Sequence, residues 1–126
     1  MHARDRVRLF LHGMKMAAAV RFIFEGRTKN MQTLASLGIT RPDAQSRVLG
    51  LTPEDYSSGP SPDHKHPGRD VWVFGLFING TEIYVKVQVV SDPPEKCVCI
   101  SFHEADRPLT YPLRKTDPTA NEEDQR

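Results

Sequence analysis

The 126-residue chain has only two cysteines, no long apolar run and a formal net charge of +1. Cys97 and Cys99 stand two apart, and neighbours at that spacing on one strand face cannot close an unstrained disulfide, so we expect a reducing compartment. No stretch approaches the roughly 18 apolar residues of a membrane span. The N-terminal segment carries scattered arginines without a small-residue cleavage site, so we expect no signal peptide. These absences predict a cytoplasmic protein that does not enter a membrane.

Several active-site motifs are also absent. The chain has no Walker loop, GxSxG, HExxH or GxGxxG, the signatures of common nucleotide, serine and zinc chemistries. The segment "DHKH" places His64 and His66 beside Asp63, but no second ligand pair follows at zinc spacing, and the cysteines form C-x-C rather than C-x-x-C. We predict no metal and no cofactor, and keep a metal-dependent enzyme built on His64 and His66 as a third hypothesis.

Charge is unevenly distributed along the chain. Residues 1–29 contain seven Lys or Arg against two acidic residues, and the tail from Thr116 reverses the sign. A basic segment on a near-neutral protein is compatible with a phosphate-bearing partner, although basic solvated faces are also common. The basic residues are Arg4, Arg6, Arg8, Lys15, Arg21, Arg27 and Lys29.

The apolar spacing predicts helices first and strands afterwards. Residues 4–17 and 28–37 show helical stripes, and Thr40 and Thr52 can cap two further helical segments. A short alternating segment, "AVRFIFEG", could add an edge strand. Residues 57–70 have three prolines and two glycines and are predicted to form a loop.

Strands are predicted over residues 71–78, 81–90 and 97–105, with Asn79-Gly80 as a type I′ hairpin turn between the first two. The fold class is therefore α+β: a small antiparallel sheet, a three-stranded meander with the N-terminal edge strand, packed against N-terminal helices. We expect one domain over residues 1–114 and a charged, poorly ordered tail over 115–126.

The alternation also predicts which side chains share a face. Tyr84 and Lys86 lie on the less apolar face of the central strand. In the segment "CVCISFHEA", Val98, Ile100 and Phe102 are predicted on one face, with Cys97, Cys99, Ser101 and His103 on the other. Less apolar faces of neighbouring strands coincide. Tyr84, Lys86, Ser101 and His103 should then form one patch.

This patch has the groups that RNA cleavage by its own 2′-hydroxyl requires. A histidine can act as acid or base near neutral pH, a lysine can stabilise phosphate charge, and a tyrosine can stack on a base or donate its hydroxyl. No metal is needed. Tyrosine and lysine on a solvated strand face are also ordinary, so spacing alone leaves a structural role open.

The order of several segments resembles the MqsR-type toxins, the motility quorum-sensing regulator family of bacterial toxin–antitoxin systems. The segments are "GRTKNMQTLASLGIT", "LTPEDYSSGPSPD", "DVWVFG", "EIYVKVQV" and "CVCISFHEADRPLTYP". The resemblance implies a RelE-like fold and a metal-independent endoribonuclease, an mRNA interferase that inhibits translation and growth. It also implies a cognate antitoxin with a helix-turn-helix DNA-binding domain, and a possible role for the ribosome.

Carried over to this chain, the family's catalytic tyrosine falls on Tyr84, a lysine on Lys86, and a basic strand-end residue on His103. Two family residues are missing: a lysine after the "D-Y" motif, where Ser57 and Ser58 stand, and a glutamine near Arg69. Lys86, Lys65 or Arg69 would then supply the missing charge. The predicted RNA-binding residues are Arg27, Lys29, Lys65, Arg69 and Ser101. The second hypothesis is a non-catalytic RNA- or protein-binding module on the same scaffold.

Overall fold

The computed structural model describes residues 1–114. The predicted tail over residues 115–126 lies outside this range. The described chain is α+β, as predicted from the sequence. Its elements are the helices α1 (Ala3–Val20), α2 (Thr28–Leu37) and α3 (Arg41–Leu49), the 3-10 helix η1 (Pro53–Asp55), and the strands β1 (Phe22–Phe24), β2 (Tyr56–Pro62), β3 (Asp70–Ile78), β4 (Thr81–Val90) and β5 (Lys96–Glu104).

The strands form one open mixed sheet of five strands in the order β1-β5-β4-β3-β2. The predicted meander is β3-β4-β5, and its strands are antiparallel. The N-terminal strand β1 does add an edge, but it runs parallel to β5. The prediction of a wholly antiparallel sheet was therefore wrong, because helices and three other strands separate β1 from β5 along the chain, and no hairpin turn forces the two to run antiparallel.

The predicted loop over residues 57–70 was wrong in its first half, where β2 pairs with β3. An edge strand forms hydrogen bonds on one side only, so it tolerates prolines that a central strand would exclude. The register shifts twice along β2. At Gly59, φ is 112° and a Cβ would lie 2.8 Å from the Val71 carbonyl oxygen, so the strand passes β3 at a distance that only glycine allows.

The hairpin between β3 and β4 is the predicted two-residue turn. Ile78 pairs with Thr81, and φ is 50° at Asn79 and 80° at Gly80. Positive φ at both central residues defines the type I′ turn, whose twist matches that of the flanking strands.

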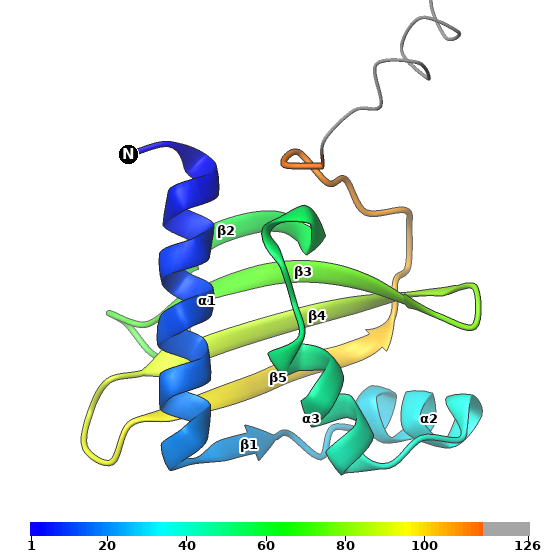
Figure 1. Cartoon of the computed structure of the whole chain (residues 1–126). Coiled ribbons are helices and arrows are strands. Elements are labelled where there is room, and N and C mark those ends of the chain that lie inside the picture. Colours follow the sequence, from blue (N-terminus) through cyan, green and yellow to red (C-terminus); the bar gives the residue numbers. More distant parts are fainter. Residues whose placement is uncertain (115–126) are drawn as a thin grey trace, which may run out of the picture.

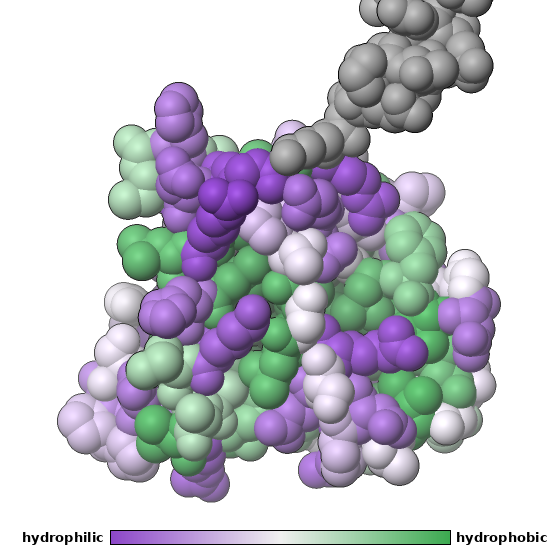
Figure 2. Space-filling view, in the orientation of Figure 1, coloured by the Kyte–Doolittle hydropathy of each residue, from purple (hydrophilic) through white to green (hydrophobic). Residues whose placement is uncertain are grey.

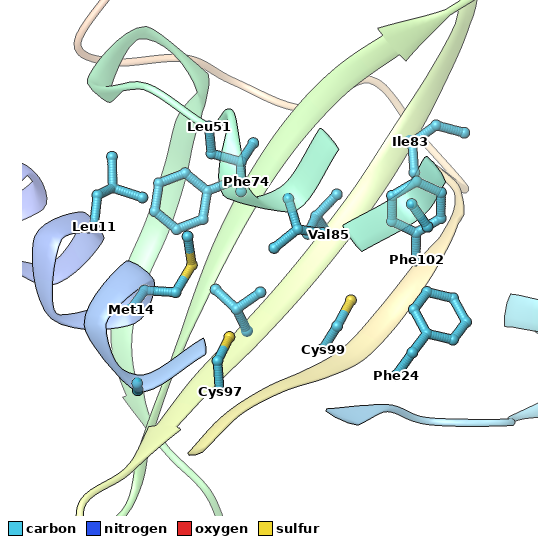
Figure 3. Packing of buried hydrophobic residues seen from close by; sticks show 14 of the residues in the cluster. Leu11, Met14, Phe24, Leu51, Phe74, Ile83, Val85, Cys97, Cys99 and Phe102 are labelled. Atoms are coloured by element: carbon cyan, nitrogen blue, oxygen red, sulfur yellow. The ribbon is translucent and has the colours of Figure 1, made fainter. Parts of the chain in front are cut away.

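The core lies between the helices and one face of the sheet. In Figure 1, α1 and α3 cross the same face. Helix α1 buries its apolar stripe there, and Leu11 and Met14 point toward Phe74 (Figure 3). No helix of the described residues covers the opposite face, which we call the open face. Within residues 1–114, no helix is both long and apolar enough to cross a membrane.

A β-bulge in β5 changes which of its residues face the core. Lys86 pairs with Ser101 but Val87 pairs with Cys99, so Ile100 is the extra residue. A shift of one residue exchanges the two faces of a strand. Cys99 and Phe102 consequently both reach the core, whereas Ile100 packs on the open face.

The predicted faces of β5 were therefore wrong on the N-terminal side of the bulge. Cys97 and Cys99 do not share the face of His103; they are free, fully buried thiols packed beneath the helices (Figure 3). Burial raises the pKa of Cys97 to about 12 and raises that of Cys99 as well. Both thiols stay uncharged at neutral pH, and we assign them to the core.

The basic residues of α1 lie on the helix-covered side of the molecule. Figure 2 shows this side, with hydrophilic side chains over α1 and apolar ones reaching the surface between α1 and the segment that carries α3. Leu9 and Met16 are exposed by 62% and 57%. The helix-covered side therefore exposes both polar and apolar side chains. On the opposite, open face, the basic residues of the N-terminal segment that line hollows are Arg27 and Lys29.

Candidate active site

The register of β4 and β5 brings the four predicted patch residues together on the open face. Tyr84 lies opposite His103, and Lys86 lies opposite Ser101. The Tyr84 and His103 rings stack with centroids 5.3 Å apart and planes 16° apart. The bulge occurs just beyond this set, so alternation holds where the four residues stand.

These residues line a groove of about 390 Å³, which we call the central groove. Its other walls come from Lys29 at the start of α2 and from the segment that follows β5. The lining residues are Lys29, Tyr84, Lys86, Ser101, His103, Ala105, Asp106, Arg107 and Leu109. A concave site with several convergent polar groups is the usual form of an active or binding site.

His103 is held in one orientation by its own strand end. Its Nδ1 lies 3.0 Å from the Glu104 carbonyl oxygen, and a carbonyl can only accept, so Nδ1 carries the proton. In the neutral ring, Nε2 is then the basic nitrogen. Burial raises the pKa of Tyr84, which therefore keeps its hydroxyl proton at neutral pH. The pair thus combines a ring nitrogen able to accept a proton with a hydroxyl able to donate a hydrogen bond.

Two cations in the central groove have no ion-pair partner among residues 1–114, namely Lys86 and Arg107. Lys29 lies 3.8 Å from the Asp106 carboxylate, with both side chains exposed. Such an exposed pair is weak and screened by salt. The groove is consequently positive beside the Tyr84–His103 stack, which suits an anionic ligand.

Arg107 was missed by the sequence reasoning. It follows β5 in a segment that has no periodic pattern, so its position depends on how that segment crosses the sheet. The only sequence signal was a second basic residue shortly after His103.

Asn30 was also missed, and it fixes α2 against β5. Its side chain is fully buried; Nδ2 donates to the carbonyl oxygens of Glu25 and Ile100, and Oδ1 accepts from the Phe102 backbone N–H. Asn30 therefore satisfies the strand backbone on both sides of Ser101, beyond the point where β1 ends. This arrangement places the neighbouring Lys29 over the central groove.

Residues 105–114, which we call the strap, cross the open face and form the remaining wall. Glu82 of β4 binds it twice, accepting from the Leu109 backbone N–H at 3.0 Å and from the Tyr111 hydroxyl at 2.6 Å. Burial, with the Glu82 carboxylate as the next cause, raises the pKa of Tyr111. At Gly75, below the strap, any Cβ would collide with the Tyr111 hydroxyl. The strap is thus seated by specific contacts.

The other predicted RNA-binding residues lie outside the central groove. Arg27 and Lys65 line a second hollow of about 240 Å³, to which Lys86 also contributes. Arg69 lines neither hollow; its guanidinium lies 3.3 Å from the Asp92 carboxylate. The structure therefore brings Lys29, Lys86 and Ser101 to His103 and Tyr84, puts Arg27 and Lys65 in the adjoining hollow, and leaves Arg69 apart.

Asp63 and His66, two of the three suggested metal ligands, have other contacts. Asp63 accepts hydrogen bonds from the Gln88 side-chain amide at 2.9 Å and lies 3.1 Å from His66 Nδ1. Among the described residues, no group of three or more His, Cys, Asp or Glu could hold a metal ion. The third hypothesis therefore gains no support from the geometry of this loop.

Comparison with known proteins does not assign this chain to a family. No family model, curated protein or solved structure matches the chain.

Proposed function

We propose that this protein is a toxin of the MqsR type with a RelE-like fold, a metal-independent endoribonuclease that cleaves messenger RNA in the cytoplasm. The observation that supports this most is the Tyr84–His103 stack beside two cations, Lys86 and Arg107, that have no ion-pair partner among the described residues. A base, a hydroxyl donor and unneutralised positive charge are what cleavage through the RNA 2′-hydroxyl requires.

The proposed reaction needs no group beyond the RNA and this chain. His103 Nε2 takes the proton of a 2′-hydroxyl, whose oxygen bonds to the adjacent phosphorus while the bond to the 5′-oxygen breaks. The products are a 2′,3′-cyclic phosphate and a 5′-hydroxyl, which receives the proton that His103 accepted. Lys86 and Arg107 stabilise the charge on the phosphorane, and the Tyr84 hydroxyl donates to one of its oxygens.

We further propose that a cognate antitoxin with a helix-turn-helix domain inhibits this activity. The protein would cleave either free RNA or RNA bound to the ribosome. These partners follow from the resemblance. A short neighbouring reading frame that encodes such a protein, and that relieves growth arrest when co-expressed, would support the pairing.

A growth assay tests the function in cells. Induced expression of the wild-type chain should arrest growth, and His103→Ala should remove the arrest at equal protein level. His12→Ala provides a matched control, because His12 is an exposed histidine on α1, away from the central groove. Full toxicity of His103→Ala would refute the assignment of His103.

The second candidate is a binding module that does not cut RNA. The observation that favours it is the position of Arg69, which pairs with Asp92 and does not replace the missing family residues in the groove. In that case the purified protein would bind RNA, or a partner protein, without producing cleavage fragments under any condition.

A further inference from the structure

The second hollow of the open face, which we call the side hollow, differs chemically from the central groove. It holds about 240 Å³ and includes two acids, Glu25 and Asp63, among its cations. Arg27 is already paired with Glu25 at 2.7 Å. With two carboxylates against three Lys and Arg side chains, the side hollow is less positive than the central groove, which has one carboxylate against three, so it attracts a phosphate less strongly. Its small volume and mixed polarity suit one neutral, planar, polar group.

Gln88 gives this hollow a hydrogen-bond acceptor of fixed direction. Its side chain is only 3% exposed, and its Nε2 lies 2.9 Å from Asp63 Oδ2. An ionised carboxylate can only accept, so the amide NH₂ must face Asp63 and the carbonyl oxygen Oε1 must face elsewhere. Oε1 of Gln88 has no hydrogen-bond partner among residues 1–114. In the same range, every fully buried side-chain N or O atom does have a hydrogen-bond partner. Oε1 is therefore accessible from the hollow that Gln88 lines.

Asp63 is itself anchored, so it can keep Gln88 in place. Its Oδ1 accepts from the Lys65 backbone N–H at 3.0 Å, and its Oδ2 is 3.1 Å from His66 Nδ1. Hydrogen bonds, first that from Gln88, lower the pKa of Asp63 to about 2. The carboxylate remains ionised at neutral pH, which keeps the orientation of the Gln88 amide fixed.

The side hollow adjoins the central groove at Lys86, which lines both. A phosphate that contacts Lys86 beside His103 would therefore place a neighbouring nucleotide at the mouth of the side hollow. The two hollows together offer one position for a phosphate and one for a base.

We propose that the side hollow is a base-reading subsite, in which Gln88 Oε1 accepts a hydrogen bond from the exocyclic amine of a cytosine or adenine. The proposal depends on the proposed RNA function and deepens it. Uracil and guanine carry a carbonyl oxygen at the corresponding position, and two acceptor oxygens repel one another. Since Gln88 cannot turn its amide without leaving Asp63 unpaired, the subsite discriminates between these bases.

Binding of short RNA to the full chain tests this proposal without depending on cleavage. The probes are fluorescein-labelled hexamers of cytidine and of uridine, 2′-fluoro-substituted so that they lack the attacking hydroxyl. Measured by fluorescence anisotropy, the cytidine hexamer should bind about fivefold more tightly, as expected for one net hydrogen bond. Gln88→Met should bind both hexamers equally. Asp63→Asn should reduce the preference as well, because the Gln88 amide could then reverse.

The outcomes separate the subsite from the broader function. Equal binding of both hexamers by the wild-type chain, or a preference that survives in Gln88→Met, would overturn the subsite and leave RNA binding intact. If neither hexamer bound, both the subsite and the RNA function would be wrong. Thermal unfolding of each variant identifies loss of fold, and Asp63→Asn provides the test if Gln88→Met does not fold.

Discussion

The Tyr84 ring lies almost parallel to the His103 ring, with the two centroids 5.3 Å apart. Adjacent strands create this pairing, since the two residues are opposite one another in the register of β4 and β5. The stack and the hydrogen bond from Nδ1 to the Glu104 carbonyl together fix the histidine ring. The orientation of His103 is therefore set by the strand pairing of the sheet and by the backbone at the end of β5.

Tyr84 is expected to contribute by stacking and through its hydroxyl. Tyr84→Phe keeps the ring and should lower the single-turnover rate of RNA cleavage about 100- to 1000-fold, as for loss of one donor to developing charge. Tyr84→Ala also removes the stack and should be slower still. Wild-type rates in both variants would show that Tyr84 acts in neither way.

Arg107 is expected to contact a phosphate of the RNA. Arg107→Ala should weaken binding of a single-stranded RNA and reduce the slope of log affinity against log salt by about 0.7, the value for one phosphate contact on a single strand. Arg47, an exposed arginine on α3, gives the matched control. An unchanged salt slope for Arg107→Ala would place the RNA elsewhere.

Asn30 is expected to be important for stability. Asn30→Ala leaves the Ile100 carbonyl and the Phe102 N–H without their buried partner, which should lower the free energy of unfolding by about 3 kcal/mol. Urea unfolding measures this loss. The exposed neighbour Gln32 provides a control, since Gln32→Ala should change stability by less than about 0.5 kcal/mol. Equal stability of the two variants would contradict the assigned role of Asn30.

Asp63 is expected to make stability depend on acid pH. The hydrogen bond from Gln88 is the main cause that lowers its pKa to about 2 in the folded chain, below the usual value of an aspartate, so the unfolded state binds the proton first as pH falls. The stabilisation is complete above about pH 4 and is lost as pH falls toward about 2. The wild-type chain should thus have a higher Tm than Asp63→Asn at pH 6, and this difference should shrink between pH 4 and pH 2. A constant difference would show that Asp63 is not held as a carboxylate.

Features set by local sequence could be predicted, and those set by distant partners could not. The alternation of β4 is local, so the shared face of Tyr84 and Lys86 could be predicted from it, and the Asn79-Gly80 turn is local too and joins β3 to β4. Strand β2 depends on an open edge of β3, and the bulge at Ile100 depends on the register with β4. Neither strand β2 nor the bulge produces a recognisable sequence pattern in the residues that form it.

In the candidate site, too, residues placed by local sequence could be predicted and residues placed by distant contacts could not. Alternation along β4 and β5 correctly predicts the face of Lys86, Ser101 and His103, because all three lie on the same side of the bulge. Arg107 reaches the groove because Glu82 seats the strap, and Gln88 acquires a fixed direction only from Asp63. These contacts join residues 25 to 29 positions apart, so spacing along the chain gives no sign of them.

The decisive measurement for the proposed ribonuclease is incubation of the purified protein with a defined RNA in excess EDTA. We expect fragments ending in a 2′,3′-cyclic phosphate and a 5′-hydroxyl. A 2′-deoxy substitution at the cleaved nucleotide should stop cleavage there, and His103→Ala should form no fragments. Absence of cleavage with and without ribosomes, or cleavage only with a divalent metal, would show that the protein is not a metal-independent ribonuclease.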